Sequence, residues 1–225
     1  MNLVECVNSE EWIRQSVAKM SGILEQALES RGRAVMIAAG GTTPADIYGA
    51  LGRIDLDWSA VTIIPSDERW VNETSNRSNL SMIKRALTRD NPANGASFQP
   101  LFMSGSSPEE AAPRLSQQVS QHVPADLCVL GMGNDRHTAS LFPGMGGLKT
   151  AMADDAPVVV PASMPVTGES RVTLTLATLR QSQCVMLLIR GRNKRVALQV
   201  ADETANGLKS PVSPLLPQAH VYWSE

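Results

Sequence analysis

The stretch GMGNDRHTASLFPG, residues 131–144, holds one of the three histidines in the chain. His137 stands two residues after Asp135, in a glycine-rich turn that follows the apolar run DLCVL. A neutral imidazole can accept a proton near pH 7, and a nearby carboxylate can orient the ring or share the work. The surroundings of His122 and His220 favour structural roles instead. These features make His137 a candidate general base.

The run AAGGTTPAD ends an apolar segment in two glycines and two threonines. Thr43 is expected to cap a helix whose first residue is Pro44, with Asp46 completing a capping box. Backbone N–H groups at the start of a helix suit an anion, and Gly41 and the hydroxyl of Thr42 add to such a site. A capped turn without a ligand is the alternative interpretation. The run has no GK[ST] and is therefore not a nucleotide-binding P-loop.

Charged side chains stand beside three further apolar runs. Asp67 and Arg69 lie in PSDERW, where a carboxylate can bind sugar hydroxyls or move a proton. Lys194 follows CVMLLIRG, and Arg171 opens RVTLTL, so that both can neutralise a phosphate. A solvated ion-pair turn is the alternative for the first pair, and ordinary surface charge is the alternative for the second.

These residues need a scaffold that brings their loops together. Apolar residues three or four apart predict a helix over residues 9–31, and short apolar runs that read as strands precede the loops. Further helices are expected at 79–88, 107–121 and 193–202. Strands that alternate with helices indicate an α/β fold with a mainly parallel sheet covered on both faces, in a single domain of residues 1–225. Ligands of such sheets bind at the carboxyl ends of the strands.

Composition and charge exclude several classes of protein. The 225 residues are 43% hydrophobic and 19% charged, as in ordinary globular proteins. A net charge of -2 gives no reason to expect nucleic acid or an anionic membrane as a partner. No apolar stretch has the length of a membrane span, and no signal peptide is visible at the N-terminus. Three isolated cysteines are typical of reduced thiols, so we expect a cytoplasmic protein.

No cofactor or metal is expected. The GMGNDR run has Arg136 where a dinucleotide-binding fingerprint needs its third glycine. The histidine and the aspartates show no established metal-ligand spacing.

The motifs GGTTP, DERWV with the following Ser78 and Asn79, LGMGNDRHTASLFPG, RVTLTL and GRNK form a specific combination. Over about residues 33–198 they resemble the lactonase branch of the glucosamine-6-phosphate isomerase/deaminase and 6-phosphogluconolactonase family. The resemblance implies a Rossmann-like fold of that type. It also implies hydrolysis of 6-phospho-D-glucono-1,5-lactone to 6-phospho-D-gluconate, in the oxidative pentose phosphate pathway, with this phosphosugar lactone as the partner.

The resemblance also implies roles for individual residues. The catalytic group comprises a general base, its companion acid and the aspartate of the DER motif, which are His137, Asp135 and Asp67. The substrate- and phosphate-binding group comprises Gly41, Thr42, Thr43, Arg69, Arg171 and Lys194.

Two departures and two alternatives accompany this resemblance. Arg136 replaces the family's usual glycine, which costs on the order of 1 kcal/mol if the position needs a positive φ. Its guanidinium otherwise points toward solvent or substrate. Arg180 stands where asparagine is common. The deaminase branch has a catalytic glutamate after its histidine, whereas residues 136–144 contain no acid, which favours the lactonase. A non-catalytic phosphosugar-binding protein is the other alternative, and the oligomeric state stays open.

Overall fold

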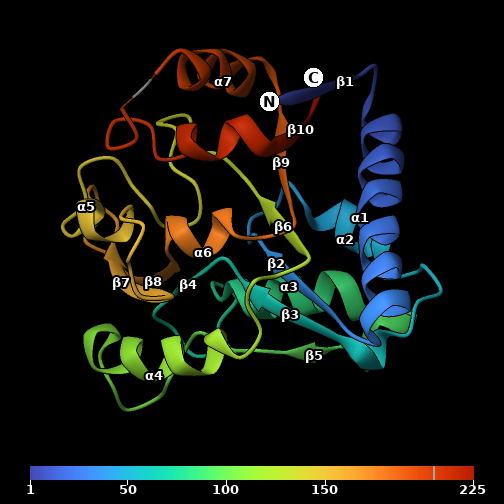
Figure 1. Ribbon diagram of the computed structural model, residues 1–225, viewed down its shortest axis with the longest axis horizontal. Coiled ribbons are helices and arrows are strands. Elements are labelled where there is room, and N and C mark those ends of the chain that lie inside the picture. The colour runs from blue at the N-terminus through green and yellow to red at the C-terminus, as the bar shows by residue number, and fades with distance from the viewer. Residues whose placement is uncertain (205) are drawn as a thin grey trace.

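A seven-stranded parallel sheet forms the centre of the computed structural model, which describes residues 1–204 and 206–225 (Figure 1). Every neighbouring pair in this sheet is parallel, and the strand order is β1-β10-β9-β6-β2-β3-β5. The bounds are β1 Asn2–Cys6, β2 Ala34–Ala38, β3 Val61–Pro65, β5 Ser97–Phe98, β6 Leu127–Leu130, β9 Cys184–Arg190 and β10 Ala219–Ser224. The predicted α/β class with a mainly parallel sheet is confirmed.

Helices cover both faces of this sheet, as predicted. The helices that pack on one face are α1 Ser9–Arg31, α2 Ala45–Leu51 and α3 Asn79–Thr88. The helices whose buried residues belong to the core on the other side are α4 Pro108–Ser120, α5 Leu148–Ala151, α6 Leu176–Arg180 and α7 Arg192–Glu203. Short 3-10 helices span Trp58–Ala60, Pro92–Gly95 and Ser213–Gln218.

The two hydrophobic cores follow from the alternation of side chains along the strands. Met36 of β2 packs in the core under α1–α3, whereas its neighbour Ile37 packs in the opposite core. Successive strand residues point to opposite faces, so a strand buried on both sides is apolar throughout. This explains why the central strands appear in the sequence as continuous apolar runs.

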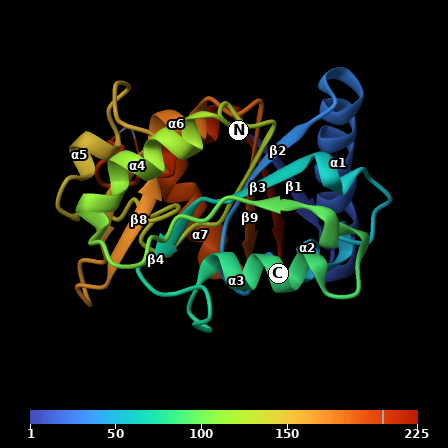
Figure 2. The same ribbon diagram turned by 90° about the horizontal axis from the view of Figure 1, so that it is seen from below.

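A second, three-stranded antiparallel sheet was not expected. Its order is β4-β8-β7, with β4 Asp67–Arg69, β7 Val159–Ser163 and β8 Ser170–Leu174. Figure 2 shows β4 and β8 on the side of the molecule that holds α4 and α5, away from α1. Ser66 connects the two sheets directly after β3. Its N–H donates to the carbonyl of Ala38 in the large sheet, and its carbonyl accepts from the N–H of Leu174 in the small sheet. The DER motif is therefore a strand, and the predicted loop there is wrong.

The helix boundaries agree with the sequence patterns except at the glycine-threonine loop. Helix α1 has the predicted span, although its N-cap is Asn8, whose side chain accepts from the N–H of Glu11. Helix α2 begins at Ala45, and the predicted Thr43 cap is wrong, because the residue in the N-cap position is Pro44, with no side-chain cap bond. No helix in the described part of the chain is long and apolar enough to cross a membrane.

Candidate active site

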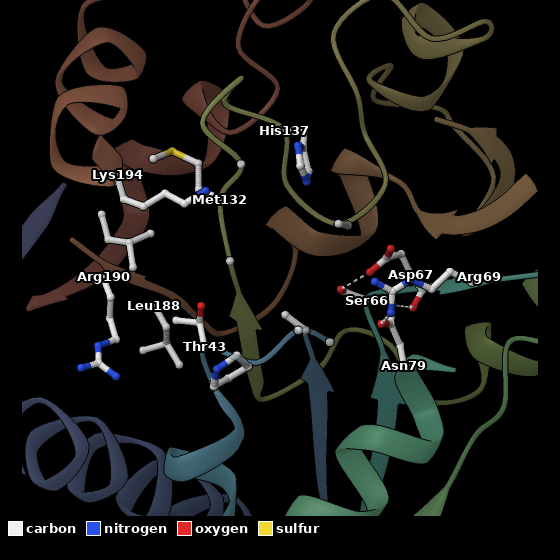
Figure 3. Close-up of a pocket in the computed structure, with 18 of the residues that line it drawn as sticks. Thr43, Ser66, Asp67, Arg69, Asn79, Met132, His137, Leu188, Arg190 and Lys194 are labelled. Carbon is white, nitrogen blue, oxygen red and sulfur yellow. Dashed lines mark hydrogen bonds between the residues drawn. The ribbon is translucent and has the colours of Figure 1, made fainter. Parts of the chain in front are cut away.

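One cavity at the carboxyl ends of β2, β6 and β9 collects most of the predicted site residues (Figure 3). Its volume is about 260 Å³. The predicted residues that line it are Gly41, Thr43, Asp67, Arg69, His137, Arg171 and Lys194. Two predicted residues do not line the cavity. Thr42 is exposed, and Asp135 contacts Nδ1 of His137. In Figure 3, Lys194 lies on one side and Asp67 and Arg69 on the other.

His137 and Asp135 form a directly bonded pair. Nδ1 of His137 lies 2.6 Å from Oδ1 of Asp135, and the backbone N–H of His137 donates to the same oxygen at 3.3 Å. A carboxylate at Nδ1 holds the proton there, which leaves Nε2 as the acceptor nitrogen of the neutral ring. Partial burial raises the pKa of Asp135, but the charge and the hydrogen bonds of His137 outweigh it, so the pKa lies below its usual value.

The glycine at position 133 makes this pair possible. A Cβ there would lie 2.1 Å from Nδ1 of His137 and 2.2 Å from Oδ1 of Asp135. The N–H of Gly133 donates to the carbonyl of His137 at 2.9 Å, which closes the loop. The ring also packs on Phe142, with the ring centroids 4.6 Å apart. The imidazole is therefore held by the loop backbone, a carboxylate and an aromatic ring.

Asp67 is buried in the wall of the cavity, and both its carboxylate oxygens are occupied. Ser140 Oγ donates to Oδ2 at 2.5 Å, and Ser66 Oγ donates to Oδ1 at 3.0 Å. Arg171 Nη1 lies 3.5 Å from Oδ2. Because its oxygens already have partners, this carboxylate suits the positioning of neighbouring groups better than the transfer of a proton.

Arg171 is buried, and two carboxylates balance its charge. Its Nε and Nη2 donate to Oε2 of Glu169 at 2.9 and 2.5 Å, in addition to the contact with Asp67. Glu169 also contacts Arg77 through its other oxygen. The guanidinium lies over the ring of Phe142, 5.4 Å from its centroid. Arg171 is therefore a less available phosphate ligand than the sequence suggested.

Lys194 is the cation at the opposite side of the cavity. It stands in the first turn of α7, after Gly191, whose φ of 84° turns the chain from β9 into the helix. Burial lowers the pKa of Lys194, and the charge of Asp135 partly opposes that shift. Lys194 forms no ion pair with any carboxylate that the structure describes. Its charge is therefore available to an anionic ligand.

Asn79 is a cavity residue to which no role was assigned from the sequence. It opens α3 and is buried, and its Oδ1 accepts from Nη1 of Arg69 at 2.6 Å. The serine-asparagine pair was visible as part of the DERWV motif, but spacing alone showed no contact with Arg69. Arg190 also lines the cavity, and its guanidinium lies over Trp12 and contacts Ser9 of α1.

Arg136 has the strained backbone that its place between Asp135 and His137 suggested. Its φ is 69°, in the left-handed region. The side chain turns neither into the cavity nor fully toward solvent, because Nη2 donates to the carbonyl of Lys209 at 3.3 Å. Its own carbonyl accepts from Val212 at 3.2 Å. Arg136 thus joins the histidine loop to residues 209–212.

The described residues contain no group of three or more histidine, cysteine or acidic side chains placed to hold a metal ion. The chemistry that this cavity offers consists of one oriented imidazole and several cations.

The chain matches the family model described as glucosamine-6-phosphate isomerases/6-phosphogluconolactonase over residues 7–223. It is 35% identical to a 6-phosphogluconolactonase of Xylella fastidiosa, covering 95% of this chain and 92% of that protein. It is also 35% identical to one of Pseudomonas aeruginosa, covering 93% and 88%. A 6-phosphogluconolactonase structure from Shewanella baltica superposes with a TM-score of 0.95 at 29% identity, covering 100% and 98% of the two chains. The chain therefore belongs to this family of sugar-phosphate enzymes.

Proposed function

We propose that this protein hydrolyses 6-phospho-D-glucono-1,5-lactone to 6-phospho-D-gluconate, the second step of the oxidative pentose phosphate pathway. The family match and the relatives named 6-phosphogluconolactonase support this activity. The observation that carries it is that His137, held by Asp135, opens on the same cavity as Lys194 and the glycine-threonine loop. A phosphosugar with its phosphate at Lys194 places its lactone carbonyl toward the imidazole.

In the proposed reaction, Nε2 of His137 takes a proton from water while the water oxygen bonds to the lactone carbonyl carbon. The tetrahedral intermediate then collapses and the bond from this carbon to the ring oxygen breaks. His137 returns its proton to the ring oxygen, which becomes a hydroxyl group, and the new carboxylic acid ionises in water. Asp135 stabilises the imidazolium that forms between the two steps, as the acid of a catalytic triad does.

Cations supply the remaining stabilisation. Lys194, with Gly41 and Thr43 beside it, holds the phosphate, which carries nearly two negative charges at neutral pH. Arg69 or backbone N–H groups of the glycine loop stabilise the oxyanion. Anchoring the phosphate away from the reacting carbon orients the lactone, and such remote binding energy can be used to accelerate the reaction. We assign Arg171 to the cavity wall, where its two carboxylate partners limit its role in phosphate binding.

A deaminase of the same family is the second candidate, because a monomeric glucosamine-6-phosphate deaminase shares the fold with a TM-score of 0.77 at 20% identity. Residues 136–144 contain no acid to act beside the histidine. Asp67 is the one carboxylate among the described residues that line the cavity, and its oxygens are occupied. Both facts favour the lactonase. Ammonia release from glucosamine 6-phosphate tests the deaminase directly.

The test of the function is a coupled assay in which freshly generated lactone is converted and the 6-phosphogluconate formed is oxidised by its dehydrogenase. We expect the protein to accelerate lactone loss well above the spontaneous rate, with or without a chelator. A protein that gains thermal stability from 6-phosphogluconate yet leaves the spontaneous rate unchanged is a phosphosugar-binding protein, and that outcome would reject the proposed activity.

We also propose that the protein works in the cytoplasm. Cys6, Cys128 and Cys184 form no disulfide with one another, which is usual where thiols are kept reduced. The family match across residues 7–223 supports the expectation of one domain.

A further inference from the structure

Asn79 makes a contact with each of the two groups that enclose one side of the cavity. Its Oδ1 accepts from Nη1 of Arg69 at 2.6 Å, and its Nδ2 donates to the carbonyl of Asp67 at 2.9 Å. Only 3% of the asparagine is exposed. The amide therefore contacts both the first and the last residue of strand β4. The strand has only three residues, and this contact adds a constraint on the direction of the Arg69 side chain.

The backbone of Asn79 is fixed by a second residue of the same strand. Glu68 Oε1 accepts from the N–H of Asn79 at 2.7 Å, and Oε2 accepts from the N–H of Leu80 at 2.8 Å and from Ser78 Oγ at 3.0 Å. A carboxylate at the start of a helix is stabilised by free N–H groups and the helix dipole. Burial nevertheless raises the pKa of Glu68, and these hydrogen bonds partly offset the shift. Helix α3 is thus attached to β4 at the position from which Asn79 reaches Arg69.

The side chain of Asn79 also lies against the glycine loop. A Cβ on Gly40 would lie 2.0 Å from Oδ1 and 2.3 Å from Cγ of Asn79. The loop proposed to bind phosphate and the arginine proposed to face the lactone therefore meet at one buried amide. A change in this amide alters the relation between the two halves of the cavity.

The chemistry of an amide suits this position. Arg69 is half-buried beside Arg171; burial, followed by the charge of Arg171, lowers the pKa of Arg69. A carboxylate at position 79 would hold the guanidinium and neutralise it. A neutral amide oxygen holds the same group and leaves its positive charge for the substrate, because a hydrogen bond to a charged donor needs no opposite charge. Arg69 forms no ion pair with a carboxylate in residues 1–204 or 206–225.

We propose that Asn79 is a positioning residue that holds the Arg69 guanidinium toward the lactone while preserving its charge. This inference rests on the proposed function, and it adds a residue that acts on the substrate through Arg69. Glu68 supports it by fixing the backbone from which the amide projects. The carbonyl of Arg77 also accepts from Nη1 of Arg69, at 3.1 Å, so we expect the loss of Asn79 to weaken, and not to abolish, the assistance that Arg69 gives the developing oxyanion.

A double-mutant cycle between Asn79→Ala and Arg69→Met tests the proposal, because coupling isolates the interaction between two residues. We expect Asn79→Ala to lower kcat/KM for the lactone roughly tenfold when Arg69 is present, the size of one hydrogen bond to a charged group. In the Arg69→Met background the same change should cost less than about twofold. An equal loss in both backgrounds overturns the proposal, since Asn79 would then act independently of Arg69.

Ser78→Ala is the matched control for the helix terminus. It removes the N-cap of α3 and one hydrogen bond to Glu68 and leaves the amide of Asn79 in place. We expect it to lower the melting temperature without coupling to Arg69→Met. A purely structural Asn79 would behave in the same way, and that result would also overturn the proposal.

The same cycle is measured on the Kd of 6-phosphogluconate by calorimetry, so that the two proposals can fail separately. A wild-type protein that is inactive but shows coupling in Kd rejects the lactonase function and retains the positioning role. An active protein with no coupling in kcat/KM or Kd rejects the positioning role alone. A wild-type protein that neither binds 6-phosphogluconate nor accelerates lactone hydrolysis rejects both.

Discussion

Oδ1 of Asp135 lies 2.6 Å from Nδ1 of His137, the ring nitrogen that does not take part in the proposed proton transfer. The pair is half-exposed, which distinguishes it from a buried structural ion pair. Its geometry sets the tautomer of the ring and leaves Nε2 for a water molecule. The proposed mechanism depends on this pair more than on any other contact in the cavity.

Replacing Asp135 by Asn tests the role of the carboxylate. An amide keeps the size of the side chain but cannot stabilise an imidazolium, and it allows the ring to adopt the wrong tautomer. We expect kcat to fall on the order of a hundredfold or more, with little change in KM. Steady-state kinetics check this, and a loss confined to KM would contradict the orienting role.

The same variant has a defined effect on the pH dependence of stability. The pKa of Asp135 is lowered in the folded state from its usual 3.8. The folded protein therefore gains stability from this group above pH 3.8, and the gain disappears as pH falls through the lowered value. Urea unfolding of the wild type and Asp135→Asn should show a difference at pH 6 that shrinks below about pH 3.8. A difference that grows on acidification contradicts this sign.

Gly133→Ala should disable the site without unfolding the protein. The new Cβ would lie 2.1 Å from Nδ1 of His137 and 2.2 Å from Oδ1 of Asp135, so that the pair must separate. We expect a loss of activity on the order of that caused by removing the base, a hundredfold or more. Gly146→Ala is the matched control, because a Cβ at that position would have no neighbour within 4 Å and Gly146 does not line the cavity. Equal activity in the two variants would argue against the importance of the pair.

Lys194→Gln should weaken binding of the phosphorylated substrate. Loss of one charged hydrogen bond to phosphate is expected to raise KM for the phosphorylated lactone by about tenfold to a hundredfold. The rate with glucono-1,5-lactone, which lacks the phosphate, should change little. Because burial lowers the pKa of Lys194, the affinity of the wild type for 6-phosphogluconate should decline on approach to alkaline pH, before the usual lysine value of 10.5 is reached. A pure kcat defect would contradict the assignment.

Arg136→Gly should stabilise the protein. A φ of 69° is unfavourable for arginine and ordinary for glycine. The variant gives up one long hydrogen bond to Lys209, and we expect a net gain of at most about 1 kcal/mol in the free energy of unfolding. Urea denaturation measures this, with kcat as a second readout that should stay within a few-fold. A destabilised variant would show that the contact with residues 209–212 outweighs the strain.

Local patterns predicted the large sheet and its helices, because each element follows a periodicity of its own. The 9–31 helix has the predicted bounds, since apolar residues recur every three or four positions up to Gly32. The small sheet was missed, because β4 has three residues and pairs with a strand more than 100 positions later. No local signal encodes such a pairing.

The sequence predicted most of the residues that line the cavity, but it did not predict the contacts among them. His137, Lys194 and Arg69 line one cavity, as expected for residues that follow strand ends in an α/β sheet. The occupied oxygens of Asp67 and the contact between Arg69 and Asn79 arise from tertiary packing around β4. Their roles stay predictions until they are measured.

The most direct test of the central claim is the lactonase activity of His137→Ala, measured with freshly generated lactone beside the Kd of 6-phosphogluconate. We predict a fall in kcat on the order of a hundredfold or more with Kd within about threefold of the wild type, because the imidazole acts on water and the cations bind the phosphosugar. A variant that hydrolyses the lactone at nearly the wild-type rate would remove His137 from the mechanism and contradict the account.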